Sequence, residues 1–252
     1  MNVINAKWEI RNIGARTAEI MLDNHDKLSD LESIQSDLDT KFEYICLKSP
    51  VANSEFLLGL GSLGYNYIET QIMLKFNKNE FELSKLMQRN VERFKNEISI
   101  HKVAGYDEAE ETILKIKNSE MFITDRIYLD TNFDRKCSGN RYYNWAMQAY
   151  NGGADVYEIY FKGHAIGISI FEASRDGVYK SVLGGIYADS NKVAFLLPVI
   201  NVLLFKKLML DGMHTTLTGV SSNNPAVLKV NLSSGYKITG FRYVYIKHNK
   251  LV

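Results

Sequence analysis

The sequence predicts an α/β protein, with a mixed sheet of the α+β kind that contains both parallel and antiparallel strands. The chain is built from two unequal parts. Segments with strand and helix patterns alternate along most of the 252 residues. From residue 97 onward the expected order is β-α-α-β-β-β-α-β-α-β, which joins an antiparallel meander to a parallel β-α-β unit. A segment that begins at Asn53 also has a weak echo at Asn224, so one supersecondary unit occurs twice.

The first part spans residues 1–96. Ser29 and Glu32 have capping-box spacing and predict a helix over 29–41. A polar segment with apolar residues at helical spacing predicts a second helix, over 80–96, that bridges to the second part. Strands are expected at 8–13, 18–22, 43–48 and 67–76.

The second part spans residues 97–252. Asp107 is expected to cap its first helix, and a polar loop over 124–139 leads to a helix over 140–150. A long apolar segment predicts a helix over 194–210, which Gly212 ends. Strands are expected at 98–103, 156–161, 165–172, 178–187 and 215–220, followed by the second copy of the repeated unit.

The echo relates residues 53–65 to residues 224–236. Each copy opens on Asn as a helix cap, ends its helix at Gly64 or Gly235, and continues into an aromatic-rich strand. The offset between the two glycines is 171 residues. If the copies are equivalent, 43–76 superposes on 215–247 and the first part lacks the complete meander. Any helix–Gly–strand unit shares this pattern, so a chance match is the alternative.

Charge and composition argue against several classes of partner. Lys and Arg together number 30 and Asp and Glu 29, a net charge of +1, and the basic residues are dispersed. We therefore expect no nucleic acid partner. The apolar run over 194–205 contains Pro198 and Asn201 and is shorter than a membrane span, so we interpret it as a buried core helix.

The cysteines and histidines predict neither a disulfide nor a metal site. Cys46 and Cys137 lie far apart, and the five histidines show no paired spacing. The N-terminus lacks a signal-peptide pattern, so a reduced cytoplasmic setting is expected. A homodimer is left open.

A resemblance to a known family rests on three segments and on their order. These are 183–190 (LGGIYADS), which a helix follows, then 220–229 (VSSNNPAVLK) and 234–236 (SGY). In this order they resemble the GNAT acyltransferase family, whose closing pattern is N-x-x-A-x-x-x-Y-x-x-x-G-F. The chain is similar to the branch that includes dTDP-fucosamine acetyltransferases, which N-acylate nucleotide-linked amino sugars. The resemblance implies a truncated GNAT-like half over 1–96, with its bridging helix, and a complete GNAT domain over 97–252.

The resemblance also implies the reaction. The chain is expected to be an acyl-CoA-dependent N-acyltransferase, with acetyl-CoA or another acyl-CoA as co-substrate, a small amine as acceptor and no metal. The amine attacks the thioester directly, so the enzyme must hold the carbonyl oxygen and help the thiolate to leave.

The catalytic positions follow from the resemblance. A backbone N–H near Gly185 and Ile186 would bind the thioester oxygen where two strands part. Asn231 stands where the family has a tyrosine general acid, and an amide donates a hydrogen bond but no proton. Tyr187 is a second candidate for completing proton transfer. The alternative for the Gly184–Gly185 pair is a simple bulge in a structural strand.

The phosphate cradle of the family, R/Q-x-x-G-x-G/A, is altered here. Its backbone N–H groups normally point at the coenzyme A pyrophosphate. Ala194 and Leu196 occupy the glycine positions, and Leu196 is expected to turn into the core. Lys192 is expected to meet a phosphate directly, beside Val193 at the helix entrance.

Two further groups complete the expected site. Asn223 and Asn224 would contact the pantetheine arm, although Asn224 before Pro225 also suits a helix cap. Residues 125–130 and 143–145 resemble the acceptor-side segment, R-F-h-x-D then L-Y-x-x-W. By that resemblance the acceptor contacts are Arg126, Asp130, Tyr143 and Trp145.

Two alternatives stay open beside the acyl-CoA interpretation. One is a tandem GNAT transferase that takes its acyl group from aminoacyl-tRNA or from acyl carrier protein, which the altered cradle favours. The nearly neutral net charge of the chain argues against aminoacyl-tRNA as the donor, because tRNA binding relies on positive charge. The other is a degenerate GNAT module that binds a ligand without chemistry.

Overall fold

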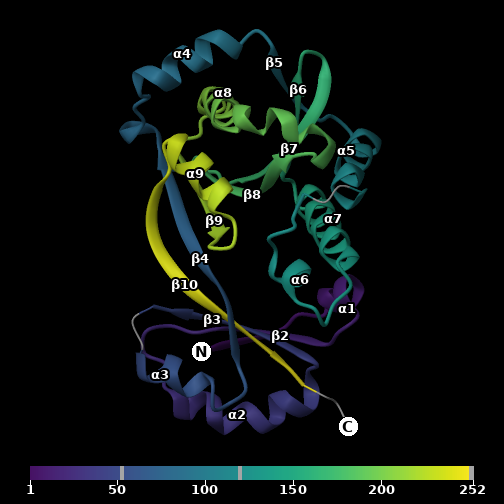
Figure 1. Ribbon diagram of the computed structural model, residues 1–252, viewed down its shortest axis with the longest axis vertical. Coiled ribbons are helices and arrows are strands. Elements are labelled where there is room, and N and C mark those ends of the chain that lie inside the picture. Colours follow the sequence, from purple (N-terminus) through teal and green to yellow (C-terminus); the bar gives the residue numbers. More distant parts are fainter. Residues whose placement is uncertain (52–53, 119–120, 250–252) are drawn as a thin grey trace.

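The computed structural model describes residues 1–51, 54–118 and 121–249. Within them, ten strands form one mixed sheet in the order β1-β2-β3-β10-β4-β9-β8-β7-β6-β5, with helices packed along it (Figure 1). The predicted mixed α/β class is confirmed. The sheet is continuous across both parts of the chain, because the last strand, β10, lies between β3 and β4.

The first part contains four strands and the helices between them. Their bounds are β1 (Asn2–Asn5), α1 (Trp8–Ile13), β2 (Thr17–Met21), α2 (Leu28–Lys41), β3 (Tyr44–Pro50), α3 (Ser54–Leu60), β4 (Asn66–Asn77), the 3₁₀ turn η1 (Lys78–Glu80) and α4 (Lys85–Phe94).

The second part follows the expected order of elements. It comprises β5 (Ile98–Lys102), α5 (Tyr106–Asn118), α6 (Arg126–Leu129), α7 (Lys136–Asn151), β6 (Asp155–Phe161), β7 (His164–Ala173), β8 (Val178–Ile186), the 3₁₀ helix η2 (Ala188–Leu196), α8 (Leu197–Leu210), β9 (Thr215–Ser221), α9 (Pro225–Ser233) and β10 (Lys237–His248). The short α6 lies in the segment predicted to be a loop, and η2 precedes the long helix.

The strand predicted over 8–13 is wrong, because these residues form α1. Gly14 ends the helix in the left-handed region, at φ 73°. Tertiary contacts decide the conformation: the Arg141 Nε lies 2.8 Å from the Glu9 carboxylate, and the Asn144 amide donates to Asn12 at 2.8 Å. Helix α1 thereby docks on α7 and joins the two parts at a second place (Figure 1).

The starts of α2, α4 and α5 also differ from prediction. In α2 the Asp30 carboxylate accepts from the Lys27 N–H, so the cap precedes Ser29. Helix α4 begins after Ser84, whose hydroxyl accepts from the Met87 N–H at 3.2 Å. Asp107 lies inside the first turn of α5, where its charge suits the helix dipole, rather than at the cap.

The echo marks a structural repeat. The units β3-α3-β4 and β9-α9-β10 have one order, and their strands alternate as β3-β10-β4-β9. Strands β4 and β10 pair symmetrically about Gln71 and Arg242, which are 171 residues apart. Each pair on one side of this centre has an equivalent pair on the other side, related by the same offset of 171 residues. The turns match too: Tyr65 N–H donates to Leu60 and Tyr236 N–H to Asn231, each at 3.1 Å. The Asn53 cap lies outside the described residues.

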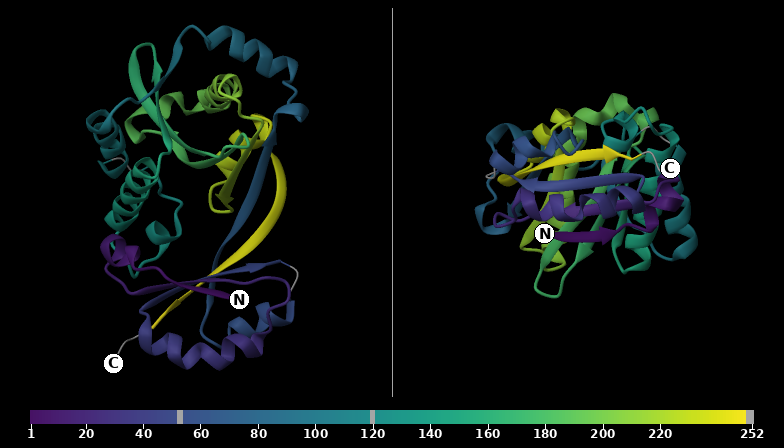
Figure 2. Two further views of the ribbon diagram at one scale, coloured as in Figure 1. Left: turned by 180° about the vertical axis from the view of Figure 1, so that it is seen from behind. Right: turned by 90° about the horizontal axis from the view of Figure 1, so that it is seen from below.

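The same symmetry reaches further into the sheet. Strands β1-β2-β3 and β7-β8-β9 share one pattern, an antiparallel pair followed by a parallel pair. Strands β5 and β6 extend only the second part, so the first part is the smaller one. We keep the division at residue 96 as a proposal, since β10 runs beside β4 into the first part (Figure 2).

One helix in the described part of the chain, Ala188–Leu210, has the length and apolar composition of a membrane-crossing helix, with a mean hydropathy of 2.0. In this fold seven of its residues are buried in core clusters against the sheet: Leu196, Val199, Ile200, Val202, Leu204, Phe205 and Leu208. Leu196 is fully buried among them, as expected for its inward side chain.

Candidate functional site

A cleft of about 940 Å³ lies between the two parts, and we call it the central cleft. Strands β2, β3 and β4 line it from the first part. Helices α6 and α7, strands β8 and β9, and helices α8 and α9 line it from the second. Lining residues come from both faces of the sheet, so the cleft passes through the sheet where β8 and β9 separate.

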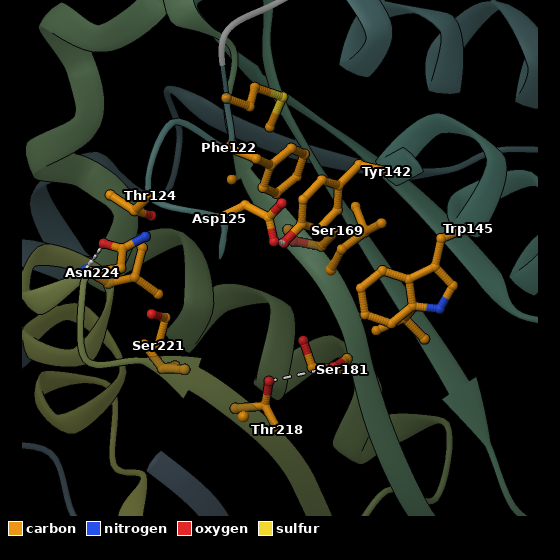
Figure 3. Close-up of a pocket in the computed structure, with 18 of the residues that line it drawn as sticks. Phe122, Thr124, Asp125, Tyr142, Trp145, Ser169, Ser181, Thr218, Ser221 and Asn224 are labelled. Carbon is orange, nitrogen blue, oxygen red and sulfur yellow. Dashed lines mark hydrogen bonds between the residues drawn. The ribbon is translucent and has the colours of Figure 1, made fainter. Parts of the chain in front are cut away.

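The separation of β8 and β9 is visible in their pairing. These parallel strands pair only from Val178–Lys180 to Thr215–Leu217, and beyond that point they diverge. The Thr218 hydroxyl donates to the Ser181 carbonyl at 3.3 Å at the base of the opening (Figure 3). A slot bounded by two strand edges is therefore available for an extended ligand arm.

The edge of β8 presents a backbone donor to this slot. The Tyr187 N–H donates to the Ile166 carbonyl on β7 at 2.8 Å. Backbone N–H groups alternate along a strand, so the Ile186 N–H points to the opposite side, where β9 has diverged. Gly184 and Gly185 pair regularly with β7, and the bulge falls at Val182 instead. An N–H at this position can bind a carbonyl oxygen that gains negative charge.

Asn231 and Tyr236 line the cleft from α9 and from the turn after it. The Asn201 amide donates to the Asn231 side-chain oxygen at 3.4 Å. Tyr236 is 5% exposed, and its hydroxyl has no hydrogen-bond partner within the described ranges. Burial raises the pKa of the Tyr236 phenol, so the group stays protonated.

Tyr187 lies outside the cleft lining. Its side chain packs in the core between the sheet and helices α5 and α7, and its hydroxyl donates to Glu158 at 3.3 Å. Burial and the Glu158 carboxylate raise the pKa of Tyr187. Period-2 alternation along the strand places it on the face away from the slot.

The segment expected to cradle a pyrophosphate is wound into the 3₁₀ helix η2. In a 3₁₀ helix each N–H donates to the carbonyl three residues earlier, so these backbone donors are engaged within the helix. Ala194 lines the cleft, whereas Val193 packs against the core. Lys192 is exposed beside the cleft and has no ion pair within the described part.

The two asparagines before α9 have different positions. The Asn224 side chain accepts from the Val227 N–H at 3.0 Å, so it caps α9, and it also lines the cleft (Figure 3). The Asn223 amide donates to the Ile68 carbonyl at 3.3 Å and lies outside the lining. Asn223 thus holds β4 against the end of β9.

Aromatic side chains line one wall of the cleft, and hydroxyl side chains from β7, β8 and β9 line the side formed by the strands. Phe122 and Tyr142 stack with ring centroids 3.7 Å apart, and Trp145 lies beside them (Figure 3). The Tyr142 hydroxyl donates to Asp125 at 3.1 Å, and burial with that carboxylate raises the pKa of Tyr142. Four hydroxyls face the same space: Ser169, Ser181, Thr218 and Ser221. This surface suits a ligand with a flat apolar face and polar edges.

The expected acceptor residues divide into two groups. Arg126 and Trp145 line the cleft. Arg126 is 8% exposed and lies 3.7 Å from Glu19, and within the described ranges its Nε has no hydrogen-bond partner. Asp130 and Tyr143 lie outside the lining. Asp130 pairs with His248 at 2.7 Å, and the Tyr143 ring faces the Lys117 ammonium 5.7 Å away.

Sequence reasoning missed the cleft residues that come from the first part and from the partner strands. Lys48, Glu69 and Gln71 reach the cleft only because β3 and β4 are joined to the second part by β10 and β9. The repeat contains an aromatic residue directly after each glycine, and this pattern was the sequence signal that could have identified Tyr236. Among the residues that the structure describes, no group of three or more His, Cys, Asp or Glu is placed to hold a metal.

No protein-family model and no curated protein matches the chain. Solved structures do. A GCN5-related N-acetyltransferase from Sphaerobacter thermophilus has a TM-score of 0.62 at 9% identity, covering 100% of this chain and 77% of its own. A GCN5-related N-acetyltransferase from Kribbella flavida has a TM-score of 0.56 at 12% identity, covering 92% and 80%.

A third similar structure is the GCN5-related glucosamine N-acetyltransferase region of a fungal multi-domain GH3 β-N-acetylglucosaminidase. Its TM-score is 0.63 at 10% identity, with 97% of this chain and 30% of that chain covered. At such identities the likeness shows the fold. The chain therefore has the GNAT fold, as the order of its elements predicted, with a smaller GNAT-like first half.

Proposed function

We propose that this chain is an N-acyltransferase that moves an acyl group, most simply acetyl, from a coenzyme A thioester to a small amine. The observation that carries the proposal is the opening between β8 and β9, where the Ile186 N–H faces a slot through the sheet. The acceptor class we propose is an amino sugar, linked to a nucleotide. The stacked aromatic wall supports it, because sugar rings and bases lie flat on aromatic faces. Both cysteines are free, which supports the cytoplasmic setting included in this proposal.

The reaction follows from these positions. The nitrogen lone pair of the amine attacks the thioester carbonyl carbon, and the oxygen gains charge against the Ile186 N–H. The C–N bond forms, the C–S bond breaks, and the nitrogen loses its proton to water. Asn231 donates a hydrogen bond to the departing sulfur, Tyr236 gives the sulfur a proton, and the phenolate that remains regains a proton from water. Holding both reactants in one slot supplies much of the rate.

The slot between β8 and β9 fits a coenzyme A thioester better than the η2 segment, where the family has its phosphate cradle. The slot accepts an extended pantetheine arm, whereas η2 leaves few backbone donors for a pyrophosphate. In our proposal Lys192 replaces them. The same observation favours a second candidate, a donor attached to a carrier protein, which brings a pantetheine arm and no adenine diphosphate.

Ligand stabilisation distinguishes these donors. At 100 times its Kd, acetyl-CoA is expected to add about 2.7 kcal/mol to the free energy of unfolding. For a chain of this size that raises Tm by roughly 5 to 10 °C. A shift with acetyl-CoA and none with S-acetylpantetheine supports the coenzyme A donor, and equal shifts support the carrier protein. No shift with either, and no turnover of any amine, would leave a non-catalytic binding module.

Asn231 is expected to act on the leaving sulfur. Asn231→Ala should lower turnover about tenfold, or about 1.4 kcal/mol, because the slot loses a donor. Asn231→Tyr restores the family's group, and turnover should hold or rise. The measurement is steady-state release of coenzyme A thiol with an active acceptor. Equal turnover in wild type and the alanine variant removes Asn231 from the mechanism.

A further inference from the structure

Two charged side chains in the central cleft, Glu69 and Lys48, have no partner within the described part of the chain. Glu69 is 8% exposed, and neither a hydrogen bond nor an ion pair reaches its carboxylate. The Lys48 ammonium is half-buried and likewise unpaired. Burying a charge without a partner is costly, so such a group in a native cleft indicates a ligand of opposite charge.

The other four carboxylates that line the cleft are satisfied by the protein. Glu9 pairs with Arg141 at 2.8 Å, and Glu172 pairs with Lys180 at 3.0 Å. Glu19 lies 3.7 Å from Arg126, and Asp125 accepts hydrogen bonds from Tyr142, Ser138 and the Ile127 N–H. Glu9 and Asp125 are as deeply buried as Glu69, so Glu69 differs from all four in lacking a partner among the described residues.

The sheet register fixes the spacing of the two charges. Val244 on β10 pairs with Lys48 on β3 at one side and with Glu69 on β4 at the other. Residues that pair directly point to the same face, so both charges face the cleft across one buried valine. Two inter-strand spacings separate their backbones by roughly 9 to 10 Å. The sheet therefore holds the two opposite charges at a fixed backbone spacing, with Val244 between them.

This pair lies at the end of the slot where the strands diverge. Gln71, two residues after Glu69, pairs with Ser221 at the carboxyl end of β9. The Thr70 N–H donates to the Ser222 hydroxyl at 3.0 Å, which fixes β4 there. A ligand held by Glu69 thus lies in the cleft from which the slot opens.

We infer that Glu69 and Lys48 bind a zwitterionic acceptor: Glu69 takes its ammonium group, and Lys48 takes a carboxylate or phosphate of the same molecule. The inference rests on the proposed function in treating the cleft as the acceptor site. It gives the smaller half a role in substrate selection. Charge-assisted hydrogen bonds from both ends orient the amine and reject amines that lack an acidic group.

Two matched pairs of probes test this by calorimetry on the full chain without donor. β-Alanine is compared with ethylamine for a carboxylate, and glucosamine 6-phosphate with glucosamine for a phosphate. At least one zwitterion should bind ten times more tightly than its partner without the acidic group. Which pair shows the difference identifies the acidic group.

Variants assign the effect to the two residues. Glu69→Gln should weaken binding of the preferred zwitterion at least tenfold, and Lys48→Met should abolish its advantage over the amine that lacks the acidic group. Glu80→Gln and Lys75→Met, on the surface away from the cleft, should bind as wild type does. Circular dichroism and Tm confirm that each variant folds. Zwitterions that bind no better than amines without an acidic group, or a Glu69→Gln variant that binds like wild type, overturn the inference. Zwitterion binding without acyl transfer supports it and counts against the proposed function instead.

Discussion

Phe76→Ala is expected to lower the free energy of unfolding by about 3 to 5 kcal/mol. Phe76 belongs to β4 of the first part and is fully buried, yet its ring lies 4.5 Å from Phe205 on α8 and 6.1 Å from Tyr236. Removing the ring leaves a cavity where the two parts share one core. Since folded chains are stable by only about 5 to 15 kcal/mol, this loss is a large share of the total.

The chain offers its own probes for this test, because Trp8 and Trp145 are its two tryptophans. Denaturant unfolding of single-tryptophan versions follows Trp8 on α1 of the first part and Trp145 on α7 of the second, and both lie where the two parts meet. One cooperative sheet predicts coincident transitions that Phe76→Ala shifts together. Phe241→Ala, at a ring 45% exposed on β10, should change stability little. A shift of one transition alone would show that the two parts fold independently.

Much of the fold was predictable because runs of β-branched and aromatic residues between turn residues are a strong local signal. Strands β6, β7 and β8 are such runs, separated by glycine turns, and the structure places them as expected, with β6 and β7 buried on both faces over most of their length. Helix α1 was not predictable, because its conformation depends on Arg141 and Asn144, more than 130 residues away. Local sequence patterns also do not predict the insertion of β10 between β3 and β4. No local feature specifies which strands pair across such a distance.

The candidate site divides in the same way. The slot edge at Gly185 and Ile186 follows from a motif in one contiguous segment, and that segment does line the cleft. Glu69 and Lys48 carry no motif, and only the pairing of both with Val244 places them on one face. Tyr187 could have been placed from the sequence, because neighbouring strand residues point to opposite faces.

Tyr236→Phe is expected to lower kcat about 100-fold while leaving the acceptor KM nearly unchanged. An amide at Asn231 supplies no proton, and Tyr236 lines the same cleft with no hydrogen-bond partner for its hydroxyl among the residues that the structure describes. Because burial raises the pKa of Tyr236, the phenol stays protonated above its ordinary value near 10. The wild-type rate should therefore show no alkaline decline from this group below about pH 10.

The internal repeat supplies the matched control for this residue. Tyr65 occupies the equivalent turn, but its hydroxyl donates to Gln35 at 3.1 Å on the far side of the smaller half. Tyr65→Phe should cost about 1 kcal/mol of stability, the worth of one hydrogen bond, and leave kcat unchanged. Tyr236→Phe should show the reverse, since its hydroxyl makes no bond that folding requires. If both variants keep the wild-type kcat, or if both lose it in proportion to stability, Tyr236 is a packing residue and the leaving thiolate takes its proton from water.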